Sequence, residues 1–217
     1  MQSFLRDAAE FLPILLQGVG LTLVVTFGAL VLSTVLGLVW AVLRVSGIGV
    51  LSGLSATAVN VIRGIPIIVQ LFYLYFVMPD LGVSLTALQA AIIGLGVAYS
   101  AYQAENFRAG IQAIDRGQIE AAQSIGMGWG LTMRRVILPQ AVRIVLPPYG
   151  NIMIMLLKDS SQASTITVAE LALQGKLIAS ASFKNTSVFT LVALMYLAMS
   201  IPLILLVRHF EKKAGKP

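Results

Sequence analysis

The longest uncharged stretch of this chain constrains its fold more than any other feature. No charged side chain occurs between Gly18 and Leu43, and about 20 apolar residues suffice for a helix to cross the hydrocarbon core of a bilayer. Of the 217 residues, 58% are hydrophobic and only 11% are charged, whereas a soluble domain has about 25% charged residues. Because so few polar side chains cannot cover a water-facing surface, the chain is predicted to be an integral membrane protein.

Five segments are long and apolar enough to span a membrane. They are Gly18–Leu43, Ala56–Met78, Thr86–Phe107, Val142–Leu157 and Val188–Val207. A backbone in lipid must form its own hydrogen bonds, so these segments are expected to be helices and the fold class to be all-α. The stretch 108–141 contains several charged residues and is therefore predicted to be a loop outside the membrane.

The two ends of the chain are predicted to lie at the membrane surface. Arg6, Asp7 and Glu10 interrupt the apolar pattern near the N-terminus. Residues 1–16 are therefore expected to form an interfacial amphipathic helix and not a cleaved signal peptide, since no small-residue cleavage site follows them. Residues 17–211 would then form the membrane domain, and residues 212–217 a cytoplasmic tail.

Basic residues fall mostly on one side of the predicted spans. Ten of the fifteen Lys and Arg residues would lie at one membrane surface: Arg44, Arg108, Arg116, Arg134, Arg135, Arg143, Arg208, Lys212, Lys213 and Lys216. The opposite surface receives Arg6, Lys176 and Lys184. Cytoplasmic loops carry the excess of basic residues, so the N-terminus is predicted outside, and the C-terminus and loop 108–141 inside. Basic residues scattered among spans do not indicate nucleic-acid binding.

The sequence lacks the residues that catalysis would need. It has no cysteine and a single histidine, His209, which excludes thiolate metal sites and disfavours imidazole-based catalysis. No glycine-rich phosphate-binding loop occurs, so the sequence gives no sign of a nucleotide site. Five spans without an internal repeat are also few for enclosing a transport path. A second copy or a homologous subunit, related by a twofold axis, is expected to complete it.

The informative part of the loop is residues 117–139, GQIEAAQSIGMGWGLTMRRVILP. Its first half consists of good helix formers, with Glu120 in the first turns, where the helix dipole favours an acidic residue. The small side chains of Ala121 and Ala122 permit close approach of another surface. Gly126 stands where such a helix would end and the chain reverse. This pattern predicts a short helix presented to the cytosol, with an ordinary amphipathic loop helix as the alternative.

This loop resembles the EAA loop of the permeases of binding-protein-dependent ABC importers, whose pattern is EAA-x3-G-x9-I-x-L-P. Glu120, Ala121, Ala122 and Gly126 match it, and only the isoleucine is replaced, by Val136. Shorter matches to the polar amino acid branch of these permeases extend over residues 17–211. They include Gly20-Leu21-Thr22-Leu23, Arg63-Gly64-Ile65-Pro66 with Gln70, Ala101-Tyr102 with Glu105, Arg108-Ala109-Gly110-Ile111, Leu138-Pro139-Gln140-Ala141 and Lys158-Asp159-Ser160.

The resemblance implies a type I ABC importer permease fold and a set of partners. The loop helix would be the coupling helix, which sits in a cleft of a separate ATPase dimer. That dimer would bind ATP and Mg²⁺, so this chain would need no cofactor of its own. A solute-binding protein outside the membrane would deliver a polar amino acid or amino-acid derivative, and a second permease, identical or homologous, would share the surrounding lipid.

Two ionisable residues fall inside the predicted spans at similar depth. At the helical rise of 1.5 Å per residue, Arg63 lies roughly 22 Å and Glu105 about 28 Å below the outer ends of their spans. They are predicted to form an ion pair that fixes helix packing, with a role in the transport path as the alternative. Pro66 removes a backbone donor and permits a local break beside them.

Six residues are assigned to the substrate pathway: Gln70, Tyr99, Ser100, Asn151, Ile152 and Asp159. Asp159 would accept the ammonium group of an amino acid or cap the following turn, and the resemblance favours the substrate. Tyr99, Ser100 and Asn151 supply polar groups at this depth, with helix packing as the alternative role for Tyr99 and Asn151. In related permeases for cationic amino acids a glutamate follows this asparagine. Ile152 therefore disfavours arginine, lysine or histidine as cargo.

Three other functions are compatible with a membrane chain. An ion-coupled secondary amino acid carrier would explain Glu105 and Asp159, but it leaves the cytosolic helix without a purpose. A membrane enzyme would need a nucleophile and a base, and a scaffold subunit would not need polar groups at the depth of a pocket. The sequence therefore favours the permease of an ABC importer.

Overall fold

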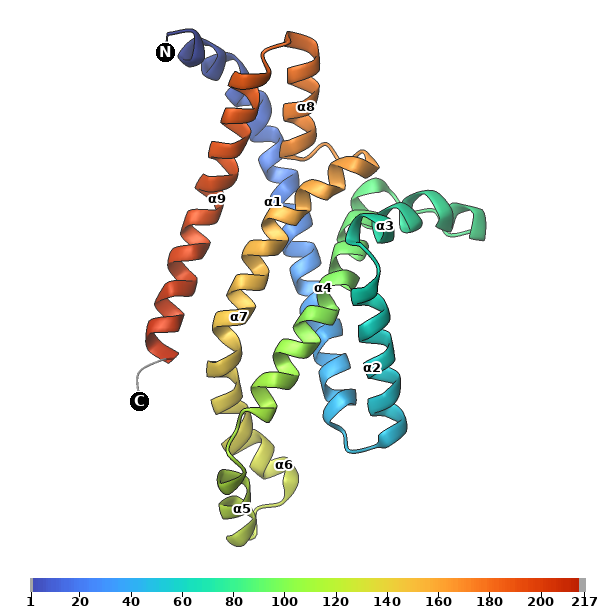
Figure 1. Ribbon diagram of the computed structural model, residues 1–217, viewed down its shortest axis with the longest axis vertical. Helices are drawn as coiled ribbons and strands as arrows, with labels where there is room; N and C mark the ends of the chain where they lie inside the picture. Colours follow the sequence, from blue (N-terminus) through green and yellow to red (C-terminus); the bar gives the residue numbers. More distant parts are fainter. Residues whose placement is uncertain (1, 215–217) are drawn as a thin grey trace.

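The computed structural model describes residues 2–214, whose regular elements are all helical. Figure 1 shows the α-helices in chain order: α1 (Gln2–Val45), α2 (Gly49–Gly64), α3 (Ile67–Phe72), α4 (Ala87–Gln112), α5 (Arg116–Ser124), α6 (Trp129–Thr132), α7 (Leu138–Asp159), α8 (Leu171–Ser182) and α9 (Asn185–Ala214). Short π or 3-10 segments are η1 (Tyr73–Val77), η2 (Met78–Leu81), η3 (Met133–Ile137) and η4 (Ser160–Ile166). The predicted all-α class is confirmed.

Helix α4 is the centre of the fold. It packs along α1 and also contacts α2, α3 and α7, and it buries Leu95, Tyr99 and Gln103 to 1% exposure or less. The contact with α1 is close because a glycine, Gly37, faces α4: a Cβ atom there would lie 2.6 Å from the Cβ of Gln103. Small residues at the interfaces of membrane helices permit this approach of two backbones.

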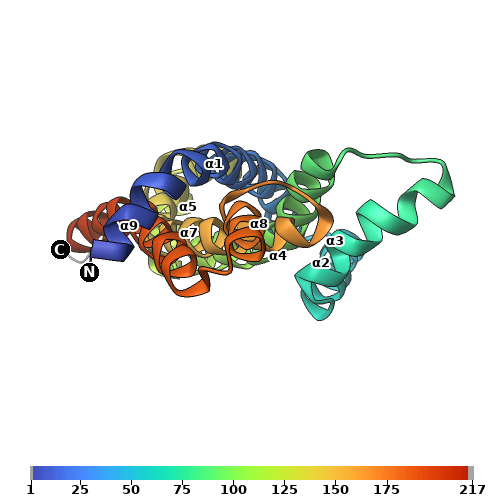
Figure 2. The ribbon, with the colours of Figure 1, turned by 90° about the horizontal axis from the view of Figure 1, so that it is seen from above.

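Hydropathy separates the outer helices from this central one. Phe4–Val45, Trp129–Ile166 and Asn185–Lys212 are each long and apolar enough to cross a membrane, and α2 with the α3–η2 segment adds a fourth span if the bent pair counts as one. Three or four spans are therefore found where five were predicted, and helix α4, which contains the predicted span Thr86–Phe107, is not among them although it is 26 residues long. Half of its residues are buried by its neighbours, so it can carry polar side chains. Figure 2 shows the elongated outline from above, with α9 towards one end and the α2–α3 region at the other.

The predicted span Ala56–Met78 is not one continuous helix. After α2 the chain bends by 96° before the α3–η2 segment. Pro66 has no N–H group and disfavours helical geometry in the preceding residue, and Ile65 is extended. Gln70 closes the break, because its Nε2 donates to the carbonyl oxygens of Ile62 and Ile65, both at 2.9 Å. The predicted break at Pro66 is therefore present, and it redirects the chain.

The expected boundary after residues 1–16 is not a helix boundary, because α1 is continuous through this region. Asp7 is 7% exposed and accepts hydrogen bonds from Lys184 Nζ at 2.6 Å and Ser187 Oγ at 2.7 Å. The first turns of α1 are thereby held against the start of α9, and the bond to Asp7 raises the pKa of Lys184. Of the predicted tail 212–217, the first part continues α9 and the last three residues lie outside the described chain.

Helix α8 stands in a region that the sequence indicated only as an external connection, and a buried carboxylate positions it. Glu170 is fully buried and caps α8 by accepting from the N–H groups of Ala172 and Leu173, both at 2.9 Å. It also accepts from Tyr196 OH of α9 at 2.7 Å and from Thr22 Oγ1 of α1 at 3.4 Å. One side chain thus joins α1, α8 and α9.

Replacing Gly37 by alanine is expected to loosen the contact between α1 and α4. The new methyl group would overlap Gln103 and lie 3.1 Å from the carbonyl oxygen of Ser100, and overpacking of this kind costs about 1–3 kcal/mol. Gly20→Ala is the matched control in the same helix, because nothing lies within 4 Å of a Cβ there. Thermal unfolding should show a lower midpoint for Gly37→Ala only. Equal midpoints for the two variants would contradict the close packing.

Candidate functional site

Two of the predicted pathway residues meet in the structure. Tyr99 OH in α4 donates a hydrogen bond of 2.7 Å to Asp159 Oδ2 at the end of α7. Tyr99 is 1% exposed, whereas Asp159 is half-buried. The Asp159 side chain makes no capping hydrogen bond to the η4 turn that follows. Its carboxylate is therefore turned towards α4 and does not serve as a turn cap.

An aromatic pair extends from this hydrogen bond towards α2. The rings of Tyr99 and Tyr102 have their centroids 5.8 Å apart. The guanidinium carbon of Arg63 lies 5.4 Å from the centroid of the Tyr102 ring, within the range of a cation–π contact. A cationic group from α2 and an anionic group from α7 therefore flank two neighbouring tyrosines of α4.

The predicted ion pair between Arg63 and Glu105 is not formed. Instead, Glu105 Oε2 accepts from Arg108, at 2.6 Å from Nη2 and 2.9 Å from Nε. Residues three apart on a helix lie on the same face, so Arg108 reaches Glu105 without any contact between helices. Similar depth in two spans did not establish that Arg63 and Glu105 face each other.

The remaining pathway residues are dispersed around this centre. Ile152 is half-buried in α7 and packs against the hydrophobic cluster that includes Tyr99. Gln70 lines an apolar cavity of about 340 Å³ beside α4 while it closes the break after α2. Ser100 is turned towards α1, where it accepts from Trp40 Nε1 at 3.3 Å, and Asn151 is exposed on α7. The structure thus brings Tyr99 and Asp159 together, places Ile152 against the hydrophobic cluster that includes Tyr99, and leaves Ser100 and Asn151 outside this group.

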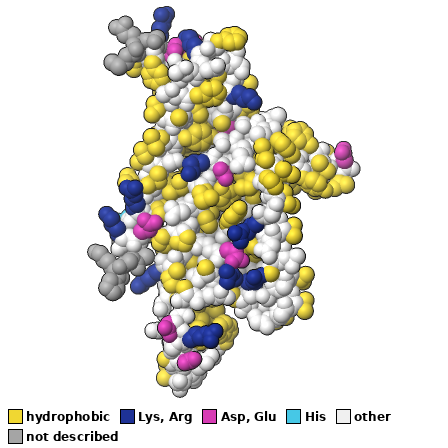
Figure 3. Space-filling model, in the orientation of Figure 1, with side chains coloured by type: hydrophobic (Ala, Val, Ile, Leu, Met, Phe, Trp, Pro, Cys, Tyr) yellow, Lys and Arg dark blue, Asp and Glu magenta, His cyan; other side chains and the backbone are white. Residues whose placement is uncertain are grey.

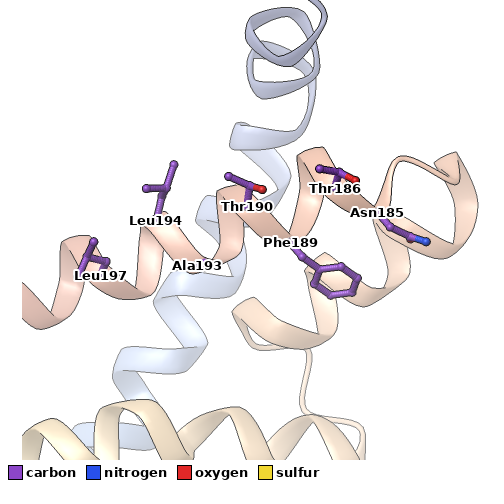
Figure 4. Close-up of a pocket in the computed structure, with 7 residues that line it drawn as sticks. All are labelled: Asn185, Thr186, Phe189, Thr190, Ala193, Leu194 and Leu197. Atoms are coloured by element: carbon purple, nitrogen blue, oxygen red, sulfur yellow. The ribbon is translucent and has the colours of Figure 1, made fainter. Parts of the chain in front are cut away.

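Another hollow lies along α9 and has a different character. Figure 4 shows that Asn185, Thr186, Phe189, Thr190, Ala193, Leu194 and Leu197 line it, all from that one helix. None of the predicted site residues contributes to it. A surface built by one helix in this way, without an ionisable side chain, resembles a lipid-facing or subunit-facing stripe more than a site for a polar ligand.

The loop helix is present and ends as predicted. Asp115 Oδ1 caps α5 by accepting from the N–H of Gly117 at 2.6 Å. Glu120 and Ala121 are exposed, whereas Ala122 is 5% exposed and packs inward. Gly126 follows with φ of +79°, a conformation that favours glycine. Helices α5 and α6 project beyond the end of the helix bundle (Figure 1).

Hydrophobic contacts attach this projection to the membrane helices. Ile114 before α5, Ile137 in η3 and Ala141 in α7 form one buried cluster. Within residues 2–214, no group of three or more His, Cys, Asp or Glu side chains lies close enough to hold a metal ion.

Comparison with known proteins places these features in one family. The sequence profile of the binding-protein-dependent transport system inner membrane component family matches residues 33–216. The chain belongs to this family. The probable amino-acid ABC transporter permease protein PatM of Vibrio harveyi is 41% identical, over 95% of this chain and 94% of its own length. The probable amino-acid ABC transporter permease protein YckA of Bacillus subtilis is 38% identical, over 95% and 91%.

A solved structure gives the same result for the fold. The crystal structure of an amino acid ABC transporter with histidines contains a chain that superposes with a TM-score of 0.90 at 35% identity, over 95% of this chain and 97% of that chain. The predicted type I ABC importer permease fold is confirmed. Family membership supports an ABC permease and not the ion-coupled carrier, and the membrane subunits of this family are not enzymes.

Proposed function

We propose that this chain is the permease subunit of an ATP-driven importer for polar amino acids or their derivatives, and that it works by alternating access. The observation that carries the substrate class is the hydrogen bond between Tyr99 and Asp159, with Arg63 on the far side of Tyr102. The named amino acid transporters among the relatives support the same class.

The two charged ends of this group suit a zwitterion. Tyr99 occupies one carboxylate oxygen of Asp159, which leaves the other oxygen for the α-ammonium of a substrate. Arg63 has no carboxylate within 4 Å among the described residues, so its charge would attract the carboxylate of a substrate that passes along the path towards Asp159.

Figure 3 shows basic and acidic side chains at several heights on the face drawn, including a group near the middle that lies beside hydrophobic side chains. A face of this kind needs a partner, because charged groups facing lipid are costly. We therefore assign the opposite wall of the path to a second permease, identical or homologous, related by a twofold axis.

The coupling helix and its partners belong to the same proposal. The exposed Glu120 and Ala121 of α5 would enter the cleft of a separate ATPase dimer that binds ATP and Mg²⁺, with Gly126 setting the reversal after the helix. A solute-binding protein would dock on the opposite membrane surface. The bias of basic residues supports an inner-membrane location with the N-terminus outside and the C-terminus in the cytoplasm.

Substitution of Gly126 tests the coupling role. Valine is strained at φ of +79°, because β-branched residues rarely adopt positive φ, so Gly126→Val should reduce transport per ATP hydrolysed in proteoliposomes while membrane insertion is retained. Gly128→Val is the matched control: its backbone is extended, with φ of −66° and ψ of 158°, and its surroundings are open. Full coupling in Gly126→Val, or equal losses in both variants, would argue against this role.

Cysteine labelling tests the orientation. The chain has no cysteine, so single cysteines report without background from this subunit. In intact cells, Ala181→Cys at the exposed end of α8 should react with an impermeant thiol reagent. Ala214→Cys at the end of α9 should react only after the membrane is opened. The reverse pattern would overturn the orientation.

Transport measurements test the cargo. Asp159→Asn should impair uptake of neutral polar amino acids by roughly tenfold to a hundredfold, the value of a charge-assisted hydrogen bond of about 1.5–3 kcal/mol. Asp80→Asn, on the exposed η2 segment, is the control. Ile152→Glu should improve acceptance of arginine, whereas Ile152→Gln, of the same size but neutral, should not. Best uptake of arginine by the unmodified transporter, with Asp159→Asn indifferent, would refute this pocket while leaving the permease assignment intact.

A further inference from the structure

Two neighbouring cavities on the cytoplasmic half of the molecule share a wall. The first is a groove of about 250 Å³ between α1, α4 and α7, and the second is a cavity of about 640 Å³ between the end of α1, the end of α4 and the coupling loop. Ile111 of α4 lines both. None of the residues proposed to contact the substrate or the ATPase lines either cavity, so neither proposal accounts for these two spaces.

The groove is apolar in a way that excludes an amino acid. Its wall consists of Leu38, Ile111 and the face of α7 between Leu138 and Tyr149. The hydroxyl groups of Thr34 and Tyr149 are hydrogen-bonded to each other at 2.9 Å, so they are already satisfied. A zwitterion would lose its hydration there without replacement, whereas an acyl chain would fit. The α7 face measures about 16 Å at the helical rise, enough for much of a lipid chain.

The second cavity combines charge with apolar surface. Arg44 from the last turn of α1 and Arg116 from the first turn of α5 line it together with Trp129. Neither arginine has a carboxylate within 4 Å in the described residues, and the adjacent Asp115 is engaged in capping α5. Trp129 is 58% exposed, and tryptophan is enriched where proteins meet the headgroup region of a membrane.

We propose that the two cavities together bind one anionic glycerophospholipid of the cytoplasmic leaflet. Its phosphate would pair with Arg44 and Arg116, and one acyl chain would lie in the groove that begins at Ile111. Basic cavities between membrane helices on this side suit acidic headgroups. Because the two arginines come from the α1 end and the coupling loop, the lipid would tie the loop to the membrane helices.

Trp129 offers a direct test, because the chain has only two tryptophans. The complete transporter is reconstituted in nanodiscs of phosphatidylcholine that contain a fixed fraction of dibrominated phosphatidylglycerol or dibrominated phosphatidylcholine. Subtracting the fluorescence of a Trp129→Phe complex isolates the Trp129 signal. Stronger quenching by the anionic lipid is expected. The excess quenching is the amount by which the anionic lipid quenches Trp129 more strongly than the zwitterionic lipid. Each basic residue near an anionic surface contributes about a fivefold preference, so Arg44→Gln/Arg116→Gln should remove most of this excess quenching.

Two further variants separate a built site from general surface charge. Arg208→Gln/Lys212→Gln removes the same charge from the exposed end of α9 and should leave the excess unchanged. Val142→Phe fills the groove, in which Val142 is 52% exposed, and should lower the excess with both arginines in place. Equal quenching by the two lipids, an equal loss in the α9 control, or an excess retained in both Arg44→Gln/Arg116→Gln and Val142→Phe would overturn the proposal. A change in Trp129 fluorescence that inorganic phosphate causes equally with either lipid would also overturn it.

Discussion

Close packing of α4 against its neighbours is the constraint on which the rest of the structure depends. In lipid there is little hydrophobic force between helices, so their association relies on close van der Waals contact and on buried hydrogen bonds. Gly37 gives the contact with α1, and the bond from Trp40 Nε1 to Ser100 lies beside it. These contacts fix the rotation of α4 about its axis. That rotation directs Tyr99 towards α7 and determines which side chains can form a site.

Features that depend on one segment at a time could be predicted from the sequence. The helical class and the reversal at Gly126 follow from hydropathy and from the freedom of glycine at positive φ. Features that depend on which helix faces meet could not be predicted in this way. Arg63 and Glu105 have similar depth, but the face of α4 that carries Glu105 also carries Arg108. Helix α8 is too short to resemble a span, and its cap Glu170 is held by residues far away in the sequence.

The candidate site shows the same difference between features of one segment and features that depend on helix packing. Tyr99 and Asp159 lie 60 positions apart, so no local rule could bring them into contact. Depth in the predicted span selected Tyr99, and the family resemblance favoured Asp159. Ser100 follows Tyr99 directly, yet successive side chains on a helix point about 100° apart. The two hydroxyl groups therefore cannot enter the same pocket. Only Tyr99 faces α7, and Ser100 contributes to the α1–α4 interface that holds Tyr99 in place.

Helix α7 connects the coupling loop with the candidate substrate site. Its first turn packs on the coupling loop through Ala141, which shares a buried cluster with Ile114 and Ile137, and its last residue is Asp159. Between them, Pro147 and Pro148 lie inside the helix, where each proline removes a backbone hydrogen bond and permits bending. Just beyond them, at Gly150, α9 packs very closely on α7. A Cβ atom added at Gly150 would lie 2.3 Å from the side chain of Val207 in α9. The bend and this tight contact lie side by side, so a displacement that enters through the coupling loop would pivot α7 against α9. Such a pivot would move the Asp159 carboxylate relative to Tyr99, because the packing of α4 against α1 holds Tyr99 in place.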